Sequence, residues 1–242
     1  MTHEGQRRAI VTGAASGIGR ATAERLLRDG WSVIGIDVRD EMPQRVTAVT
    51  GDAAETTTLE AALELAGDRL DGLVCAAGLP PNADWDDEAA WQELLRVDLS
   101  APFDAFRVCR PALAAVRGSV VFVGSIVGPL EGSGRSPGYA AAKSGLVGLT
   151  KSLALIAATD GVRVNVVEPG AIDTPLDPPR FPADDRPDVP LGRMGTADEV
   201  AGVICFLLSQ DASYITGAEV VVDGGRSIAG PSLAARANAA RA

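Results

Sequence analysis

Seven short runs of apolar and β-branched residues alternate along this chain with segments whose apolar residues recur at helical spacing. Runs this apolar are typical of strands that are buried on both faces, as in a parallel sheet with helices on each side. The expected strands are residues 8–13, 31–37, 45–50, 71–78, 119–124, 162–170 and 219–225. The expected helices are residues 21–30, 56–66, 86–97, 101–117, 138–158 and 197–209. The alternation predicts a doubly wound α/β fold with a seven-stranded parallel sheet.

Length and composition fit a single domain over residues 1–242. A chain of 242 residues with 46% hydrophobic content can bury one large core. No apolar run approaches the ~18 residues needed to cross a bilayer. The first ten residues lack the pattern of a secretory signal. The formal charge of −10 argues against nucleic acid or an anionic membrane as partners.

Histidine and cysteine are too scarce for several kinds of chemistry. His3 is the only histidine, which argues against hydrolases with a Ser-His or Cys-His pair and against His-ligated metal sites. The cysteines, Cys75, Cys109 and Cys205, are widely spaced within apolar stretches. We interpret them as buried, reduced thiols, and we expect a cytoplasmic protein without a bound metal.

The sequence VTGAASGIG joins the first expected strand to the first expected helix, and it contains Gly13, Gly17 and Gly19. Glycines at this spacing let the backbone turn tightly and approach a pyrophosphate, whose charge lies at the positive end of the helix. Ser16 and Ile18 belong to the same turn. A tight turn that binds no ligand is the alternative. The position of the turn in an alternating α/β chain favours a Rossmann-type dinucleotide site.

Asp37 ends the second expected strand, where a carboxylate can accept hydrogen bonds from the adenosine ribose. It would repel a 2′-phosphate, and Ser16 adds no positive charge, so we expect NAD rather than NADP as the cofactor. Arg39 is close enough to contact a phosphate, and a solvated loop acid is the alternative for Asp37. Asp52 is a candidate for contact with the adenine amino group, or a plain loop acid.

Two rare side chains, Tyr139 and Lys143, lie four residues apart in the sequence GYAAAKSG. Oxidation of an alcohol needs a base for the hydroxyl proton, but a free tyrosine, with a pKa of about 10, is too protonated at neutral pH to serve. An ammonium about 4 Å away stabilises a phenolate by roughly 4 kcal/mol at an effective dielectric of about 20. A spacing of four places both residues on one helix face. The pair therefore indicates acid/base chemistry, with a solvated surface pair as the alternative.

Together these motifs resemble the short-chain dehydrogenase/reductase family over about residues 8–226. TGAASGIG is similar to the family's cofactor turn, GYAAAKSG to its Tyr-x-x-x-Lys motif, and RVNVVEPGAIDTP and residues 190–225 to its later segments. The resemblance implies that Tyr139 is the acid/base, that Lys143 also holds the nicotinamide ribose, and that Ser125 orients the substrate oxygen. It also implies a homotetramer. Further cofactor contacts that it implies are Ala76, Ala77, Gly78, Pro169, Gly170, Ile172 and Thr174.

Three features of the sequence depart from the family pattern. The sequence CAAG, residues 75–78, replaces Asn-Asn-Ala-Gly, so contacts from those asparagine side chains are absent although backbone contacts can persist. Gly124 replaces a serine beside Ser125. Asp98 stands where the family usually has its fourth catalytic residue, an asparagine.

Asp98 allows two interpretations. Its backbone carbonyl alone could matter, as in relatives where that carbonyl holds a water near the lysine. Alternatively, its carboxylate offsets part of the positive charge with which Lys143 stabilises a tyrosine phenolate. For a carboxylate and a phenolate about 7 to 8 Å apart, at an effective dielectric of about 20, this opposing interaction is roughly 2 kcal/mol.

The substrate is expected to be a small alcohol or ketone. Residues 175–193 are proline-rich and are expected to form a lid over the nicotinamide. Arg135, Arg180 or Arg186 could anchor a substrate carboxylate. Apolar walls, which favour an apolar secondary alcohol, are expected from Leu79, Pro80, Ile126, Val127 and Leu130.

The sequences GIDVRD and DGLVCAAG are similar to bacterial hydroxysteroid dehydrogenase/carbonyl reductases. The sequence therefore predicts an NAD-dependent alcohol dehydrogenase/ketone reductase. One alternative is an NADPH-dependent 3-oxoacyl-acyl-carrier-protein reductase, and another is a non-catalytic nucleotide-binding module. The Ala/Arg-rich tail, residues 227–242, is compatible with a helix, a lid or disorder.

Overall fold

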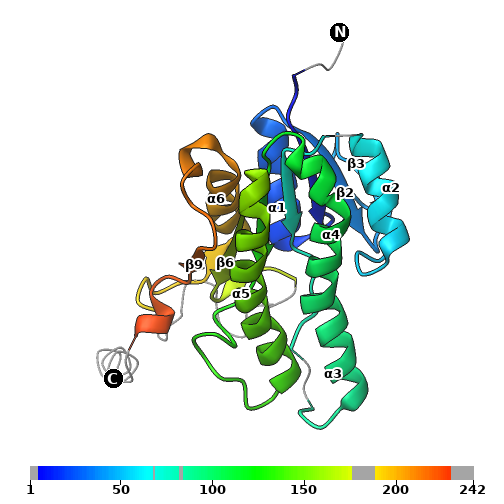
Figure 1. The fold of residues 1–242 in the computed structure, drawn as a ribbon. Coiled ribbons are helices and arrows are strands. Elements are labelled where there is room, and N and C mark those ends of the chain that lie inside the picture. Colours follow the sequence, from blue (N-terminus) through cyan, green and yellow to red (C-terminus); the bar gives the residue numbers. More distant parts are fainter. Residues whose placement is uncertain (1–4, 68, 82–83, 176–188, 230–242) are drawn as a thin grey trace.

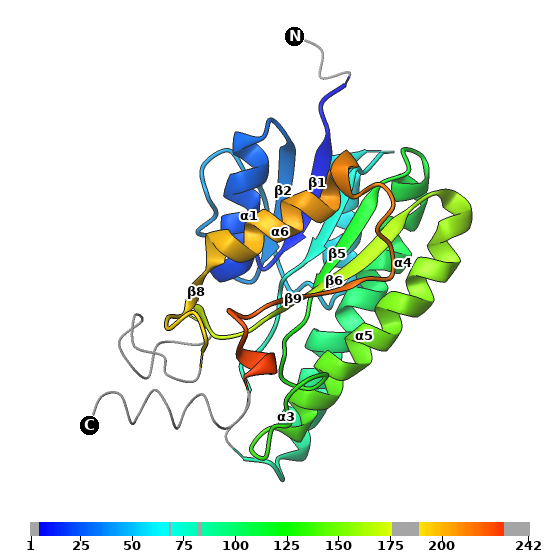
Figure 2. The ribbon, with the colours of Figure 1, turned by 90° about the vertical axis from the view of Figure 1, so that its left-hand side faces the viewer.

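The computed structural model describes residues 5–67, 69–81, 84–175 and 189–229. Among these residues, seven parallel strands form one sheet in the order β3-β2-β1-β4-β5-β6-β9. Figures 1 and 2 show this sheet between its flanking helices. The strands are β1 (Arg8–Thr12), β2 (Ser32–Asp37), β3 (Thr47–Thr50), β4 (Gly72–Cys75), β5 (Ser119–Val123), β6 (Arg163–Pro169) and β9 (Glu219–Val222). The predicted doubly wound α/β fold is confirmed, and each strand lies within its expected range.

Helices cover both faces of this sheet. On one face, α1 (Gly17–Arg28) packs beside α6 (Ala197–Leu208), as Figure 2 shows. On the other face lie α2 (Thr56–Ala66), α4 (Ala101–Ala114) and α5 (Pro137–Ala157). Ala9 and Val11 of β1 belong to the same core cluster as Leu26 of α1, whereas Ile10 belongs to the cluster of Phe106 in α4. Both faces of β1 are thus buried, which explains its continuous apolar sequence.

The predicted helix over residues 86–97 is interrupted. It begins as α3 (Glu88–Leu95), and a π-helical turn, Arg96–Ser100, then leads directly into α4. A π turn holds more residues per turn than an α-helix and occurs often at functional sites. Here it contains Asp98, which is buried.

Two further strands were not predicted. They are β7 (Ile172–Asp173) and β8 (Gly195–Thr196), which pair in parallel and are too short to show a periodic pattern. The expected lid, residues 175–193, and the expected tail, residues 227–242, lie largely outside the described residues.

Helix α5 and the residues after it, Pro137–Asp160, are long and apolar enough to cross a membrane by length and composition. In the fold, α5 packs against β6 and α3, and it buries Leu146 and Leu153 in the core. The apolar composition of this segment therefore serves the packing of α5 against the sheet.

The three cysteines are free, but they are not all buried. Cys75 and Cys109 are buried, whereas Cys205 is only partly buried. The expectation of a buried thiol is wrong for Cys205, because it lies on α6 between the buried Ile204 and the exposed Phe206, at the edge of the packed face.

The strand order reverses beside β1. This strand lies between β2 and β4, so the chain runs outward to β3 and then crosses back to β4 on the other side. Where the order reverses, the loops at the carboxyl ends of the strands run in opposite directions and leave a crevice that binds ligands in open α/β sheets. The topology thus places a site beyond the carboxyl ends of β1 and β4.

Candidate active site

A cavity of about 560 Å³ lies at this edge of the sheet. It extends from the end of β2, at Asp37, to Tyr139 and Lys143 on α5. All but two of the predicted site residues line it, the exceptions being Gly19 and Asp98, which are buried behind it. The lining residues that the sequence predicted are Gly13, Ser16, Gly17, Ile18, Asp37, Asp52, Ala76, Ala77, Gly78, Ser125, Tyr139, Lys143, Pro169, Gly170, Ile172 and Thr174.

The glycine turn needs its glycines for steric reasons. Gly13 and Gly17 have φ angles of 70° and 54°, a left-handed conformation that side chains with a Cβ rarely adopt. A Cβ on Gly19 would lie 2.2 Å from the carbonyl oxygen of Gly13. A Cβ on Gly17 would lie 3.6 Å from the side chain of Thr174, so the turn faces the segment that follows β6. The glycines keep the backbone compact and leave open space beside the first turn of α1.

Asp37 is bound into this turn rather than exposed. Its Oδ2 accepts a hydrogen bond of 3.0 Å from the backbone N–H of Ala15, and its Oδ1 accepts one of 3.0 Å from the backbone N–H of Arg39. The Arg39 guanidinium also lies 3.3 Å from Oδ1 and donates a hydrogen bond to Ser16. The side chain of Asp37 is 6% exposed, so the alternative of a solvated loop acid is wrong.

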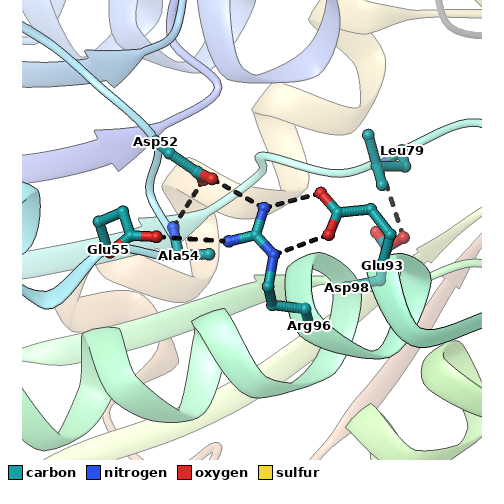
Figure 3. A network of polar contacts seen from close by, with 7 residues as sticks. All are labelled: Asp52, Ala54, Glu55, Leu79, Glu93, Arg96 and Asp98. Carbon is teal, nitrogen blue, oxygen red and sulfur yellow. Dashed lines mark hydrogen bonds and ion pairs between the residues drawn. The ribbon is translucent and has the colours of Figure 1, made fainter. Parts of the chain in front are cut away.

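Asp52 takes part in an ion-pair network that Figure 3 shows. Its Oδ2 lies 2.8 Å from Arg96, which also lies 2.7 Å from Glu93 and 3.9 Å from Glu55. Burial by itself would raise the pKa of Asp52, but the N–H of Ala54 and the guanidinium of Arg96 outweigh it and hold the pKa below its usual value. Arg96 thus joins the loop after β3 to the start of the π turn, a link that no local sequence pattern indicates.

Thr12 holds the segment that departs from the family pattern. Its hydroxyl oxygen accepts hydrogen bonds of 3.1 and 3.0 Å from the backbone N–H groups of Ala76 and Ala77. Thr12 itself is buried at the end of β1. The backbone after β4 is therefore fixed without the asparagine side chains, as the sequence left possible. The role of Thr12 was not predicted.

Ser125, Tyr139 and Lys143 lie together at the far end of the cavity. Ser125 follows β5, and its hydroxyl oxygen accepts a hydrogen bond of 3.1 Å from the N–H of Val127. Tyr139 and Lys143 lie in the first two turns of α5 and are both buried. The Lys143 Nζ lies 5.5 Å from the centroid of the Tyr139 ring and donates a hydrogen bond of 3.2 Å to the carbonyl of Val123. The alternative of a solvated surface pair is wrong.

Asp98 faces Lys143 directly. Its Oδ1 lies 2.9 Å from the Nζ of Lys143, and its Oδ2 accepts a hydrogen bond of 3.4 Å from the N–H of Leu79, the contact at the right of Figure 3. Burial lowers the pKa of Lys143, but the negative charges of Asp98 and Tyr139 outweigh it and raise this pKa above its usual value. The carboxylate therefore contacts the lysine itself, which the interpretation through the backbone alone did not include.

The substrate end of the cavity is partly as expected. Leu79, Ile126 and Val127 line it, whereas Pro80 and Leu130 do not. The possible carboxylate anchor Arg135 is exposed and does not line the cavity. The other two, Arg180 and Arg186, lie outside the described residues.

One cation at this end was missed. Arg226 lines the cavity from the segment after β9, and its guanidinium forms two hydrogen bonds, of 3.1 and 3.0 Å, with the carboxylate of Glu131. These residues are 95 positions apart, so sequence patterns could not pair them.

With this geometry in hand, comparison with known proteins gives the family. Residues 13–227 match the family model described as Enoyl-(Acyl carrier protein) reductase, which belongs to the short-chain dehydrogenases/reductases. The chain is a short-chain dehydrogenase/reductase. It is 40% identical to a cyclohexanol dehydrogenase from Acinetobacter sp. (strain SE19), over 89% of this chain and 93% of the relative.

Other relatives of this short-chain dehydrogenase/reductase differ in substrate. A cis-4-hydroxycyclohexanecarboxylate dehydrogenase from Sinomonas cyclohexanicum is 38% identical over 91% of this chain and 96% of the relative. The 3-oxoacyl-(acyl-carrier-protein) reductase FabG of Salmonella typhimurium is 37% identical, over 93% and 98%. The ligand-free aldohexose dehydrogenase of Thermoplasma acidophilum superposes with a TM-score of 0.86 at 30% identity, covering 93% of this chain and 96% of the other. The family is thus shown, whereas its members act on different alcohols and ketones.

Proposed function

We propose that this short-chain dehydrogenase/reductase interconverts a secondary alcohol and a ketone with NAD(H). The observation that carries the proposal is the meeting of Ser125, Tyr139 and Lys143 in the cavity that also contains the glycine turn. A nucleotide-binding module without activity has no need of a buried tyrosine–lysine pair beside a serine hydroxyl, so this arrangement favours the enzyme.

The residues present fit a dinucleotide. The glycine turn leaves space beside the first turn of α1, where a Cβ on Gly17 would project toward Thr174, and helix N-termini favour phosphate groups. In our proposal Gly13 to Gly19 hold the pyrophosphate, Asp37 the adenosine ribose and Lys143 the nicotinamide ribose. The nicotinamide supplies the hydride acceptor for alcohol oxidation and the hydride donor for ketone reduction.

Three side chains of the site carry out the proton transfer and orient the substrate. Tyr139 accepts the hydroxyl proton during oxidation and returns it during reduction, so it must exchange between phenol and phenolate. The Lys143 ammonium, one helical turn along α5, stabilises the phenolate. The hydroxyl of Ser125 is held by Val127 at the cavity wall and orients the substrate oxygen toward Tyr139.

The cofactor preference depends on Asp37. We expect Asp37→Ala to weaken the use of NAD and to relieve the repulsion of NADP, so that the ratio of kcat/KM for NAD to that for NADP falls by about tenfold, or roughly 1.4 kcal/mol. Because Asp37 also accepts the Ala15 N–H, the alanine variant loosens the glycine turn for both cofactors, and the ratio is the informative quantity.

Asp37→Asn is the matched control, because an amide oxygen can still accept the Ala15 N–H but carries no charge. If charge selects the cofactor, this variant shifts the ratio about as far as Asp37→Ala does. An unchanged ratio in both variants would show that another group recognises the ribose.

The substrate end favours a neutral molecule. Its described apolar wall consists of Leu79, Ile126 and Val127, and the charge of Arg226 is offset by its two hydrogen bonds to Glu131. Within the described part of the cavity wall, a substrate carboxylate would have to displace Glu131 from Arg226 or lose its ionic partner, and an unpaired charge away from water is costly. With the cyclohexanol dehydrogenase among its relatives, we propose a neutral, mainly apolar secondary alcohol as substrate.

Turnover of an alcohol panel tests this. The panel holds cyclohexanol, cis-4-hydroxycyclohexanecarboxylate, a hydroxysteroid and a 3-hydroxyacyl thioester, each with NAD and with NADP. We expect the neutral alcohols with NAD to exceed the carboxylate in kcat/KM by about tenfold or more. If the thioester with NADP is the best pair, the protein is instead a 3-oxoacyl-acyl-carrier-protein reductase, which the FabG relative and the position of Arg39 beside Ser16 support.

The homotetramer and the cytoplasmic location stay proposals. Side chains such as Phe103 of α4 and Leu155 and Ile156 of α5 are exposed, and Val221 of β9 is exposed at the sheet edge. Exposed apolar side chains on α4, α5 and β9 support the burial of these elements against other copies of the chain.

A further inference from the structure

The Asp98–Lys143 contact brings two opposite charges together where water is excluded. The Asp98 Oδ1 and the Lys143 Nζ are 2.9 Å apart, and their side chains are 0% and 7% exposed. A pair of this kind interacts far more strongly than the same charges in water, since little solvent screens it. It also fixes the position of the ammonium, which is hydrogen-bonded to the Val123 carbonyl at 3.2 Å.

The absence of a side chain at Gly78 leaves space for the contact between Asp98 and Lys143. A Cβ on Gly78 would lie 2.7 Å from the Asp98 Oδ1 and 3.6 Å from the Lys143 Nζ, so the pair in this geometry requires a glycine at position 78. Asp98 belongs to the π turn, whereas Lys143 belongs to α5. The backbone N–H of Leu79 donates a hydrogen bond to the second carboxylate oxygen of Asp98. Two separate elements therefore direct the carboxylate toward the lysine.

The charge of Lys143 is then shared between two partners. Among the described residues, the titratable groups that act on it are Asp98, from the π turn, and Tyr139, from its own helix α5. From β5 the neutral carbonyl of Val123 accepts a hydrogen bond from it. An ammonium already paired with a carboxylate stabilises a neighbouring phenolate less than an unpaired one does.

We propose that Asp98 is a positioning residue that holds the Lys143 ammonium in place and takes up part of its charge, so that Tyr139 releases its proton at a higher pH than Lys143 alone would allow. An asparagine at this position has no charge to oppose the lysine. The kinetic consequence, an oxidation reaction displaced toward alkaline pH, rests on the proposed function, whereas the effect on Tyr139 itself does not.

The composition of the chain permits a direct test. Only two tyrosines are present, and Tyr214 is fully exposed. In a Tyr214→Phe background, the tyrosinate absorbance therefore reports Tyr139 alone, without cofactor or substrate. We expect Asp98→Asn in this background to move the midpoint of that absorbance to lower pH by about one unit, because the Lys143 ammonium, no longer paired with a carboxylate at 2.9 Å, stabilises the phenolate more strongly. An unchanged or higher midpoint overturns the proposal.

A second variant keeps the test decisive if Asp98→Asn does not fold. Gly78→Ala displaces the carboxylate by contact and is expected to move the midpoint in the same direction, by a smaller amount.

Two controls check for unspecific effects. Asp104→Asn removes a carboxylate that is paired with Arg107 on the surface of α4, and Gly148→Ala adds a Cβ on α5 that meets no atom within 4 Å. Both controls should leave the midpoint in place; a shift of equal size in either one contradicts the proposal.

The pH profile of kcat/KM for alcohol oxidation separates this inference from the proposed function. If the protein oxidises alcohols, the acid limb of the profile in Asp98→Asn should move to lower pH in step with the absorbance midpoint. If the absorbance moves and neither protein turns over any alcohol, the proposed function fails and the role of Asp98 stands. If the enzyme is active and the acid limb stays in place while the absorbance moves, Asp98 has no part in setting the reaction's pH dependence, and that part of the proposal is refuted.

Discussion

Tyr139→Phe is expected to lower kcat for alcohol oxidation by about 10²- to 10⁴-fold, the usual contribution of a positioned acid/base, while NAD still binds. Phenylalanine keeps the ring, so the buried packing of this side chain is retained, but it has no hydroxyl to accept the substrate proton. The dinucleotide contacts that we propose come mainly from the glycine turn and Asp37, on the other side of the cavity. The measurements are kcat with the best alcohol of the panel and the Kd for NAD by calorimetry.

The second tyrosine is the natural control. Tyr214→Phe makes the same chemical change at a fully exposed position outside the cavity, and it should leave kcat unchanged. Activity of Tyr139→Phe within tenfold of the parent protein would remove Tyr139 from the mechanism. A large loss of NAD affinity would show instead that the phenol supports the cofactor.

Gly19→Ala is expected to have the largest effect on cofactor binding, with a loss of NAD affinity of more than about 100-fold, or roughly 2.7 kcal/mol. The added Cβ would lie 2.2 Å from the carbonyl oxygen and 2.7 Å from the carbonyl carbon of Gly13. These are backbone atoms of the glycine turn, so relief requires the turn and α1 to separate. The same strain should lower the free energy of unfolding by about 3 kcal/mol, the upper end of the usual cost of overpacking.

Gly202→Ala is the matched substitution. Gly202 is also a helical glycine, on α6, and a Cβ there meets no atom within 4 Å. This variant should bind NAD as the parent protein does and should be slightly more stable, because alanine is the better helix former. Calorimetry for NAD and urea denaturation for both variants check the pair, and equal behaviour of the two would contradict the steric account of the turn.

The strands, the helices and their alternation along the chain could be predicted because burial on both faces of the sheet requires continuous apolar runs in the strands. β1, β5 and β6 show this, since hydrophobic clusters cover both of their sides. The π turn could not be predicted, because it differs from an α-helix only in the partner of each backbone N–H, and its residues are ordinary helix formers. Strands of two residues, such as β7 and β8, carry no periodic signal at all.

Within the site, local motifs predicted the residues and tertiary contacts decided their partners. Tyr139 and Lys143 were found because one helix sets their spacing. For their neighbour Asp98 the family pattern left two interpretations open, and the direct contact with Lys143, 45 positions along the chain (143 − 98), decides that the carboxylate reaches the lysine. Arg96 and Arg226 gave no signal, because their distant partners, Asp52 and Glu131, are brought near them only when the chain folds.

The topology of the sheet also determines the order in which this site can be assembled during synthesis. Ala9 of β1 pairs with Gly72 of β4, and contacts between such distant segments close late in folding. A growing chain can complete β1 to β3, with the glycine turn and Asp37, before Ser125 and Tyr139 have left the ribosome. The opposite wall is added last, because its described lining residues extend along the chain to Arg226, after β9. A dinucleotide therefore stabilises the finished protein but can give little help to the nascent one.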